Sequence, residues 1–329
     1  MLARSLCLVT ATLLLAGSAE AQRAGKRAQA KPKAAYHAVK IRQPLKPVRI
    51  APKVHKLAFI KSLKADNAAL KRGLTDYRSV RLRIRDLRKT SPHLEVRPLI
   101  KTKSFIVDKL VLKSAKTTTT KPKILIVGGV HAGSETIGVE AALQVAEHLG
   151  KNPAILEHFD ITIIPLVNPT GLMRGDATKS KNGTPGRYTS DGVDINRSFG
   201  AGRWTPESKA MADLMKTERF HAILDLHGAG SHRDGFFIIK GTDDGGIASR
   251  FTSQAQGVPL LTREGAGTTY NFNTPGVVTS SNEGTLKQFG VSIGTRHSYT
   301  FEAPGKLSAE KQIAGTLSLV NSALNALRP

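Results

Sequence analysis

Cysteine is almost absent from this chain of 329 residues, since Cys7 is the only one. It lies in a short apolar run at residues 6–15, which Arg4 precedes and the small-residue pattern AEA at residues 19–21 follows. This order is typical of a secretory signal peptide, so we expect residues 1–21 to be removed. A mature chain without cysteine excludes disulfides, thiolate metal ligands and a cysteine nucleophile.

Long hydrophobic runs are also missing. After the N-terminal segment, no stretch stays apolar over the roughly 20 residues that a helix needs to span a bilayer. We therefore expect no transmembrane helix in the mature chain. Together with the signal peptide, this predicts a periplasmic or secreted protein.

Acidic residues are scarce in the N-terminal third. The whole chain has 49 Lys and Arg against 25 Asp and Glu, a net charge of +24. Residues 21–123 hold 29 basic and 5 acidic residues, whereas residues 124–329 hold 19 of each. The excess of positive charge therefore belongs to the N-terminal part, and the rest of the chain is neutral.

We interpret residues 22–100 as a basic linker or segment, in part helical, that precedes the main domain at residues 101–329. Residues 55–77 have apolar positions at helical spacing. Residues 78–88 alternate arginine with apolar residues, which fits either a half-buried strand or an amphipathic helix. The segment has few aromatic residues to stack on bases, so we expect no nucleic acid partner. We expect it instead to contact anionic envelope polymers.

Continuous apolar runs alternate with helical patterns in the rest of the chain. Such runs are typical of strands buried on both faces of a parallel sheet. We expect strands at residues 105–112, 123–127, 160–167, 222–226, 235–240 and 298–301, and helices at residues 136–149, 206–219 and 308–327. Thr205 and Ser308 are the expected N-caps of the last two helices. The alternation predicts an α/β fold with a mixed, mainly parallel central sheet flanked by helices.

Four polar residues follow or close predicted strands: His131, Asn168, His227 and Glu302. In open α/β sheets, ligands bind beyond the carboxyl ends of the strands. If these strands are neighbours and broadly parallel, the four side chains converge. We therefore expect a functional site at that edge of the sheet.

Two of these residues are candidate metal ligands, together with an acid in the first loop. His131 and Glu135 lie in the glycine-rich segment GGVHAGSE, and His227 precedes a glycine. Imidazole nitrogen and carboxylate oxygen are ordinary zinc ligands, and three protein ligands leave a fourth position open, as in catalytic sites. The alternative is a strand-to-helix loop in which Ser134 or Glu135 caps the next helix, with a structural His227.

Other candidates lie near the same strand ends. Glu302 closes the apolar strand SYTF, and a carboxylate beside a catalytic metal can take up a proton and later return it to a leaving group. Arg197 offers a planar fork to a carboxylate, Asn196 offers a neutral donor, and Arg187 is a second cation. The alternatives are a surface glutamate and a loop arginine in a surface salt bridge.

Taken in order, these segments resemble the M14-type zinc metallocarboxypeptidase family, which includes bacterial peptidoglycan-peptide carboxypeptidases and amidases. The family pattern is a glycine-turn His-x-x-Glu, then Asn-Pro-x-Gly, then Gly-Val-Asp-x-Asn-Arg, then a third His after a strand, then a Glu near the C-terminus. All five parts occur here in that order, from about residue 105 to the end. The resemblance implies a zinc carboxypeptidase-like α/β/α sandwich in which residues 101–329 are the catalytic domain.

The resemblance also implies a role for each candidate. One Zn²⁺ ion would be held by three ligands, and Glu302 would be the general base. Arg187 would stabilise the oxyanion of the scissile carbonyl, while Asn196 and Arg197 would hold the C-terminal carboxylate of the substrate. Tyr270 is the nearest candidate for a tyrosine that many members place near that carboxylate. The implied set is metal ligands His131, Glu135 and His227, catalytic Glu302 and Arg187, and substrate-binding Asn196, Arg197 and Tyr270.

One departure from the family pattern concerns the acidic ligand. Glu135 stands four residues after His131, where the family has three, and the residue at the family position is Ser134, a poor zinc ligand. Either the loop bulges by one residue at Gly133, or Glu135 is not a ligand. We expect the bulge, because a three-ligand catalytic site needs a third donor.

The sequence therefore predicts an exported zinc metallopeptidase that hydrolyses a peptide or amide bond near a free C-terminal carboxylate. Export makes peptidoglycan stem peptides the candidate substrate. One alternative is a deacylase of N-acyl amino acids, similar to succinylglutamate desuccinylase and aspartoacylase. The other is a catalytically degenerate binding protein tethered to anionic envelope polymers.

Overall fold

A computed structural model describes most of the chain after residue 75. The described residues are 76–114, 120–174, 186–200, 202–230, 233–262, 270, 272 and 274–329. The expected signal peptide and nearly all of the expected helix at residues 55–77 lie outside them. Within this part of the chain, no helix is both long and apolar enough to cross a membrane.

The described residues form an eight-stranded mixed sheet with the order β1-β2-β4-β3-β5-β8-β6-β7. The strands are β1 (Leu94–Lys101), β2 (Ile106–Leu112), β3 (Lys123–Gly128), β4 (Asp160–Ile164), β5 (Ala222–Gly228), β6 (Phe237–Lys240), β7 (Val277–Thr279) and β8 (His297–Ala303). The four central strands β4, β3, β5 and β8 are parallel neighbours. Antiparallel pairs join β2 to β4 and β6 to β8. The predicted α/β fold with a mixed, mainly parallel sheet is confirmed.

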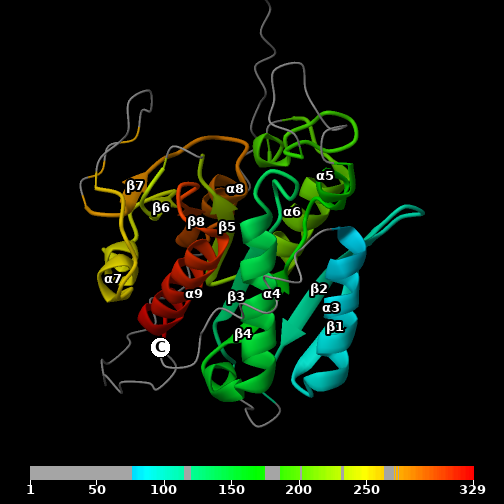
Figure 1. The fold of residues 1–329 in the computed structure, drawn as a ribbon, viewed down its shortest axis with the longest axis horizontal. Helices are drawn as coiled ribbons and strands as arrows, with labels where there is room; N and C mark the ends of the chain where they lie inside the picture. Colours follow the sequence, from blue (N-terminus) through cyan, green and yellow to red (C-terminus); the bar gives the residue numbers. More distant parts are fainter. Residues whose placement is uncertain are drawn as a thin grey trace, which may run out of the picture. The chain divides into compact units, whose positions relative to one another are not determined.

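Helices cover both faces of this sheet. Figure 1 shows α4 and α9 side by side across one face, with α3 farther along it. Helices α6 and α8 pack on the opposite face. The helices are α3 (Tyr77–Thr90), α4 (Thr136–Lys151), α5 (Pro169–Arg174), α6 (Pro206–Glu218), α7 (Ile247–Gln254), α8 (Leu286–Ser292) and α9 (Ala309–Ala326). Two 3₁₀ turns, η2 (Pro153–Glu157) and η4 (Ile195–Arg197), complete the order.

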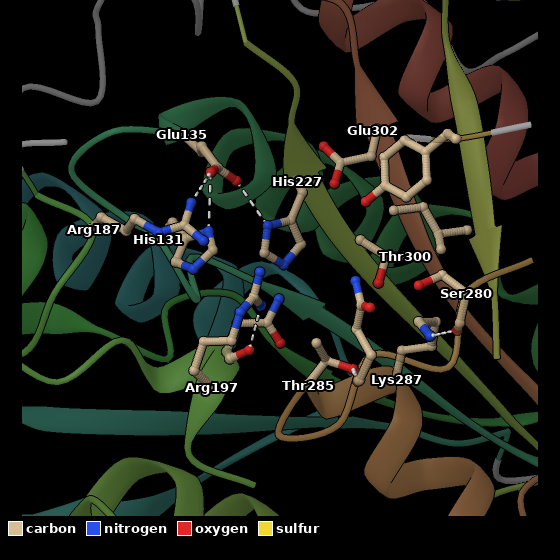
Figure 2. A pocket seen from close by; sticks show the side chains of 14 residues that line it. His131, Glu135, Arg187, Arg197, His227, Ser280, Thr285, Lys287, Thr300 and Glu302 are labelled. Atoms are coloured by element: carbon tan, nitrogen blue, oxygen red, sulfur yellow. Dashed lines mark hydrogen bonds and ion pairs between the residues drawn. The ribbon is translucent and has the colours of Figure 1, made fainter. Parts of the chain in front are cut away.

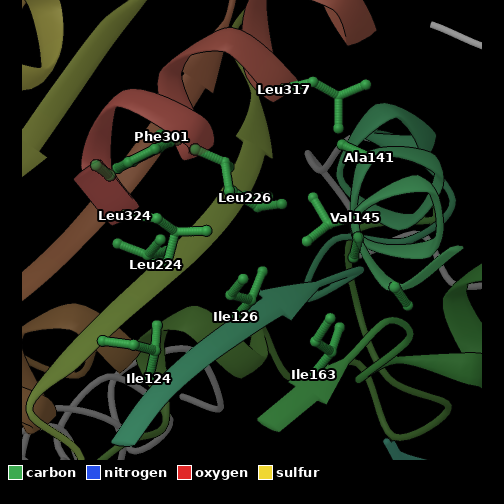
Figure 3. Close-up of a cluster of buried hydrophobic side chains, with 14 of the residues drawn as sticks. Ile124, Ile126, Ala141, Val145, Ile163, Leu224, Leu226, Phe301, Leu317 and Leu324 are labelled. Carbon is green, nitrogen blue, oxygen red and sulfur yellow. The ribbon is translucent and has the colours of Figure 1, made fainter. Parts of the chain in front are cut away.

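The central strands are buried on both faces, as their continuous apolar sequences predict. In β3, Ile124 and Ile126 face the cluster under α4 and α9, whereas Leu125 and Val127 face the cluster under α6 and α8. Figure 3 shows the first cluster, where strand residues meet side chains of α4 and α9 such as Val145. Two hydrophobic layers therefore hold the parallel strands in place and fix the edge where they end.

Helix α6 begins at the predicted N-cap. The Thr205 hydroxyl accepts a hydrogen bond from the amide of Ser208, and the Ser208 hydroxyl accepts one from the amide of Thr205, which makes a reciprocal capping box. Ser308 caps α9 by accepting from the amide of Lys311. Both predicted caps are confirmed, because short hydroxyl side chains satisfy amides that a first helical turn leaves unpaired.

The fold extends further towards the N-terminus than the predicted boundary at residue 100. Residues 78–88, which fitted either a strand or a helix, lie in the amphipathic helix α3, which buries Val80, Ile84 and Leu87. Strand β1 pairs with β2 across that boundary. The arginines between the apolar residues occupy the other face of the helix. The basic composition therefore suggested a linker, although the apolar face of this segment is part of the core.

Truncating a buried side chain of α3 tests whether this helix is part of the cooperative fold. Ile84 is 3% exposed, so Ile84→Ala is expected to lower the free energy of unfolding by about 2–5 kcal/mol through lost burial and a residual cavity. Leu82 lies on the outer face of the same helix at 38% exposure, and Leu82→Ala should change stability by less than about 0.5 kcal/mol. Urea unfolding of both variants provides the measurement. Equal effects of the two substitutions would show that α3 is not packed as described.

Candidate active site

The carboxyl ends of the parallel strands bring the predicted residues to one edge of the sheet. His227 in β5 lies opposite Glu302 in β8 in the parallel register. The loop after β3 carries His131 and Glu135 to the same edge. Asn168 follows β4, but its side-chain oxygen Oδ1 accepts hydrogen bonds from the Thr170 hydroxyl and the amide of Gly171, so it holds a turn.

A carboxylate lies between two imidazoles at the centre of the site. Oε1 of Glu135 is 2.9 Å from Nδ1 of His131, and Oε2 is 2.7 Å from Nδ1 of His227. The two rings meet edge to face, with centroids 4.9 Å apart. One ligand atom from each of the three residues lies within 4.8 Å of the others, so the three could hold one metal ion. Figure 2 shows the three side chains pointing toward one another.

Two further carboxylates fix the outer nitrogens of the same rings. Nε2 of His131 is 2.9 Å from Oδ1 of Asp194, and Nε2 of His227 is 3.0 Å from Oδ2 of Asp225. A carboxylate accepts a hydrogen bond, so each Nε2 donates to its outer carboxylate. This leaves each Nδ1 facing Glu135 at the centre, where it would offer its lone pair to a metal ion. Histidine ligands of zinc are commonly held in this way by an outer carboxylate.

The charges of the site maintain this arrangement. Burial alone raises the pKa of Glu135, but the attraction of His131 and His227 outweighs it and holds the pKa well below its ordinary value. Burial is likewise outweighed at Asp194, where His131 and Arg187 lower the pKa to about 2. Both carboxylates are therefore ionised at neutral pH and attract a cation.

The donor set matches what zinc binds. Two imidazole nitrogens and one carboxylate oxygen converge, and both imidazoles have an outer carboxylate partner. The one cysteine of the sequence, Cys7, lies outside the described residues, and hard cations such as Mg²⁺ prefer oxygen ligands alone. The residues present therefore fit a Zn²⁺ ion with open coordination positions.

The loop from His131 to Glu135 makes one tight turn. This turn accommodates the additional residue by which the spacing of the two side chains exceeds His-x-x-Glu. The amides of Ser134 and Glu135 both donate to the carbonyl of His131, at 3.1 and 2.9 Å. A Cβ added to Gly133 would lie 2.4 Å from the carbonyl oxygen of Gly171, so only glycine fits there. Glu135 is the N-cap residue of α4 but makes no capping hydrogen bond with its side chain, so the alternative of a helix-capping Glu135 does not apply.

Two arginines lie on one side of this centre. Nε of Arg187 donates to Oδ2 of Asp194 at 2.9 Å, and its Nη1 is 3.6 Å from Oε1 of Glu135. Arg197 is exposed and donates to the carbonyl of Asn196 at 2.7 Å. The Asn196 side-chain oxygen accepts from the amide of Leu286 at 2.9 Å, which leaves its amide nitrogen for the cavity. The cluster can receive an anion beside the candidate metal centre.

Glu302 lies on the other side. It lines the cavity next to His227, and burial raises its pKa to about 7, although the two histidines oppose the shift. A carboxyl group with a pKa near neutrality can accept a proton and return it within one reaction cycle. The geometry therefore suits a general base.

All eight predicted site residues line one cavity with a volume of about 180 Å³. They are His131, Glu135, Arg187, Asn196, Arg197, His227, Tyr270 and Glu302. The ring of Tyr270 lies 6.0 Å from that of Phe237 on β6. The structure thus brings the set together, and the role of each residue stays a prediction.

Sequence reasoning missed the two outer carboxylates. Asp225 stands two residues before His227 on the same strand, so the period of two puts both side chains on one face. Asp194 lies within the segment that yielded Asn196 and Arg197, but its partner His131 is 63 residues away. The position of Asp225 beside His227 could have been predicted from strand periodicity. The pairing of Asp194 with His131 depends on a tertiary contact.

Comparison with known proteins agrees with the resemblance that the sequence motifs indicate. A family model described as zinc carboxypeptidase matches residues 101–315. Carboxypeptidase D of Anas platyrhynchos is 30% identical over 121 residues, and carboxypeptidase D of Mus musculus is 29% identical over 131 residues. Each alignment covers 33% of this chain and 9% of the relative, so the chain corresponds to a small part of these proteins.

Solved structures share the fold at low identity. A crystal structure described as that of a candidate metallopeptidase from Shewanella denitrificans aligns with a TM-score of 0.61 and 20% identity, over 78% of this chain and 92% of that one. A metallo-carboxypeptidase from Burkholderia cenocepacia aligns with a TM-score of 0.59 and 16% identity, over 76% and 68% of the two chains. At such identities the likeness is evidence of the fold alone.

Proposed function

Because the chain belongs to the zinc carboxypeptidase family, we propose that it is a metallocarboxypeptidase. It would remove the C-terminal residue of a peptide, which carries the free carboxylate. The observation that carries this proposal is the order of groups around one cavity. A cluster of three candidate metal ligands lies between a half-buried glutamate and two arginines. The arginines can bind the terminal carboxylate and thereby place the last peptide bond beside the metal centre and Glu302.

Each group then has a defined task. Zinc bound by the three ligands would supply a Lewis acid that polarises the scissile carbonyl and makes water a better nucleophile. Glu302 takes the proton of the attacking water and delivers it to the departing amine. Arg187 donates to the carbonyl oxygen as negative charge develops on it. Arg197 and the amide nitrogen of Asn196 hold the terminal carboxylate.

We further propose that the enzyme is exported and acts on peptidoglycan stem peptides in the periplasm or outside the cell. The signal-peptide pattern at residues 1–21 supports export, and the basic composition of the residues after it supports attachment to anionic envelope polymers. Stem peptides are amide substrates that an exported peptidase would meet, which makes them the candidate. Fractionation of cells that produce the full chain tests the location.

A substrate panel separates this function from its alternatives. The zinc-loaded protein is incubated with linear peptides, purified stem peptides and N-acyl amino acids, and released amino acids are quantified with and without a chelator. Chelator-sensitive release from the peptides supports a carboxypeptidase. Release only from N-acyl amino acids identifies a deacylase, and binding without release identifies a degenerate binding protein.

Removing an outer carboxylate should weaken metal binding without removing a ligand. Asp194→Asn loses the ionised acceptor that fixes the proton on His131, so zinc affinity is expected to fall about 10–100-fold. Asp213 is exposed on α6 and pairs with Lys209, away from the site, so Asp213→Asn is the matched control. Competition with a fluorescent zinc chelator measures both. Unchanged zinc affinity in the Asp194 variant would mean that this contact does not orient the imidazole.

A further inference from the structure

Lys287 is a buried cation in the wall of the proposed substrate cavity. It is the second residue of α8, it is 2% exposed, and it lines the same cavity as Glu302 and Arg197. Its Nζ donates to the backbone carbonyl of Ser280, and this is its one hydrogen bond to the described residues. An ammonium group has three donors, and a buried charge is costly unless it is paired.

No carboxylate of the described residues forms an ion pair with this ammonium. Asp225 on β5 is the acid that raises the pKa of Lys287, but it forms no ion pair with Nζ, and its Oδ2 contacts His227 instead. Burial is the larger effect and lowers the pKa to about 8, so most of the side chain is still charged at pH 7. Among the described residues, this ammonium therefore keeps its positive charge and has donors that no acceptor takes up at the cavity wall.

The neighbouring wall is polar. Thr300 lies on β8 two residues before Glu302, so both side chains lie on the same face of the strand. Ser280 and Thr285 also line the cavity. A wall of hydroxyl groups around an ammonium favours an anionic group over an apolar one.

This positive charge is separate from the arginines. Figure 2 shows Arg187 and Arg197 on one side of the cavity and Lys287, Ser280 and Thr300 on the other. One substrate residue can therefore place its main-chain carboxylate on the arginines and a second carboxylate on Lys287. Only an amino acid with an acidic side chain carries both groups.

We infer that the cavity selects a C-terminal residue with a carboxylate side chain, such as glutamate or aspartate, and that Lys287 is the residue that determines this preference. The inference rests on the proposed function, because it assumes that the C-terminal residue enters this cavity. A neutral or basic side chain would leave the ammonium buried and unpaired. Discrimination then comes from both the attraction of an acid and the desolvation cost of other residues.

A matched series of peptides that differ only in the last residue tests the inference. The probes end in Glu, Gln, Leu or Lys, and kcat/KM is measured with the zinc-loaded full chain. The Glu peptide is expected to exceed the isosteric Gln peptide by about 30-fold or more, because truncating one partner of a buried charge pair has an effect of that size. Lys287→Met should abolish this ratio and leave the Leu peptide within about threefold of its original rate or faster, whereas Lys287→Arg should retain a preference for Glu.

The outcomes distinguish the preference for acidic residues from the proposed carboxypeptidase function. Release of Leu and Gln at the rate of Glu by the unaltered protein would overturn the inference and leave the carboxypeptidase function in place. An equal loss on all peptides in Lys287→Met would also overturn it, since Lys287 would then only offset the charge of Asp225. Release from none of the peptides would overturn the proposed function, and the inference with it.

Discussion

Glu302→Gln is expected to lower kcat by about 10²–10⁴-fold, the contribution that a general acid–base group typically makes. Glutamine keeps the shape of the side chain but cannot accept the proton of the attacking water. Because Glu302 is not one of the three candidate metal ligands, zinc content should stay unchanged. Steady-state kinetics and metal analysis of the same preparation measure both quantities.

The exposed Glu283 provides the control for this experiment. It lies just before α8 and is absent from the cavity lining, so Glu283→Gln should retain full activity. A Glu302→Gln protein with full peptidase activity and full zinc content would show that Glu302 is not the base. A parallel loss of zinc and activity would instead assign Glu302 a structural or metal-binding role.

Glu135→Ala is expected to cost more than 100-fold in zinc affinity, and activity should be lost at low free zinc. The loss should exceed the roughly 10–100-fold expected for an outer carboxylate such as Asp194, because Glu135 would itself supply a ligand atom. Removing it also leaves His131 and His227 without the anion between them. Chelator competition and metal analysis measure the loss.

Ser134 is the matched control, because it stands where the family spacing places the acidic ligand. Its hydroxyl donates to the carbonyl of His131 at 3.3 Å, away from the metal centre. Ser134→Ala should therefore bind zinc as the unaltered protein does. The opposite pattern, zinc loss in Ser134→Ala and none in Glu135→Ala, would mean that the loop has a different register in solution.

Much of the fold could be predicted because its signals are local. The continuous apolar runs of β3, β4 and β5 are typical of strands buried on both faces, and the caps Thr205 and Ser308 mark helix starts. The strands β1 and β7 were not predicted. Strand β7 has three residues, and β1 fully buries Leu94 alone among its eight residues, so neither shows a pattern without its neighbour in the sheet.

The candidate site was predictable where strand ends carry unusual polar residues, as at His131, His227 and Glu302. The residues that support the site were harder to predict from the sequence. The pairing of Asp194 with His131, and the approach of Lys287 to the cavity, depend on contacts between segments far apart in the chain. The position of Glu135 could not be settled from spacing alone, because the turn at Gly133 is held by contacts with Gly171 and Gly186.

The central claim is that a metal centre and a carboxylate-binding cluster act together on the last peptide bond. The most direct measurement compares one peptide with a free C-terminus and the same peptide with an amidated C-terminus, followed by mass spectrometry with zinc-loaded and metal-free protein. The account predicts that the zinc-loaded protein shortens the free peptide by its last residue and acts at least about 100-fold more slowly on the amide, since the arginine pair loses its anion. Cleavage of both peptides at equal rates, cleavage inside the chain, or equal activity of the metal-free protein would contradict it.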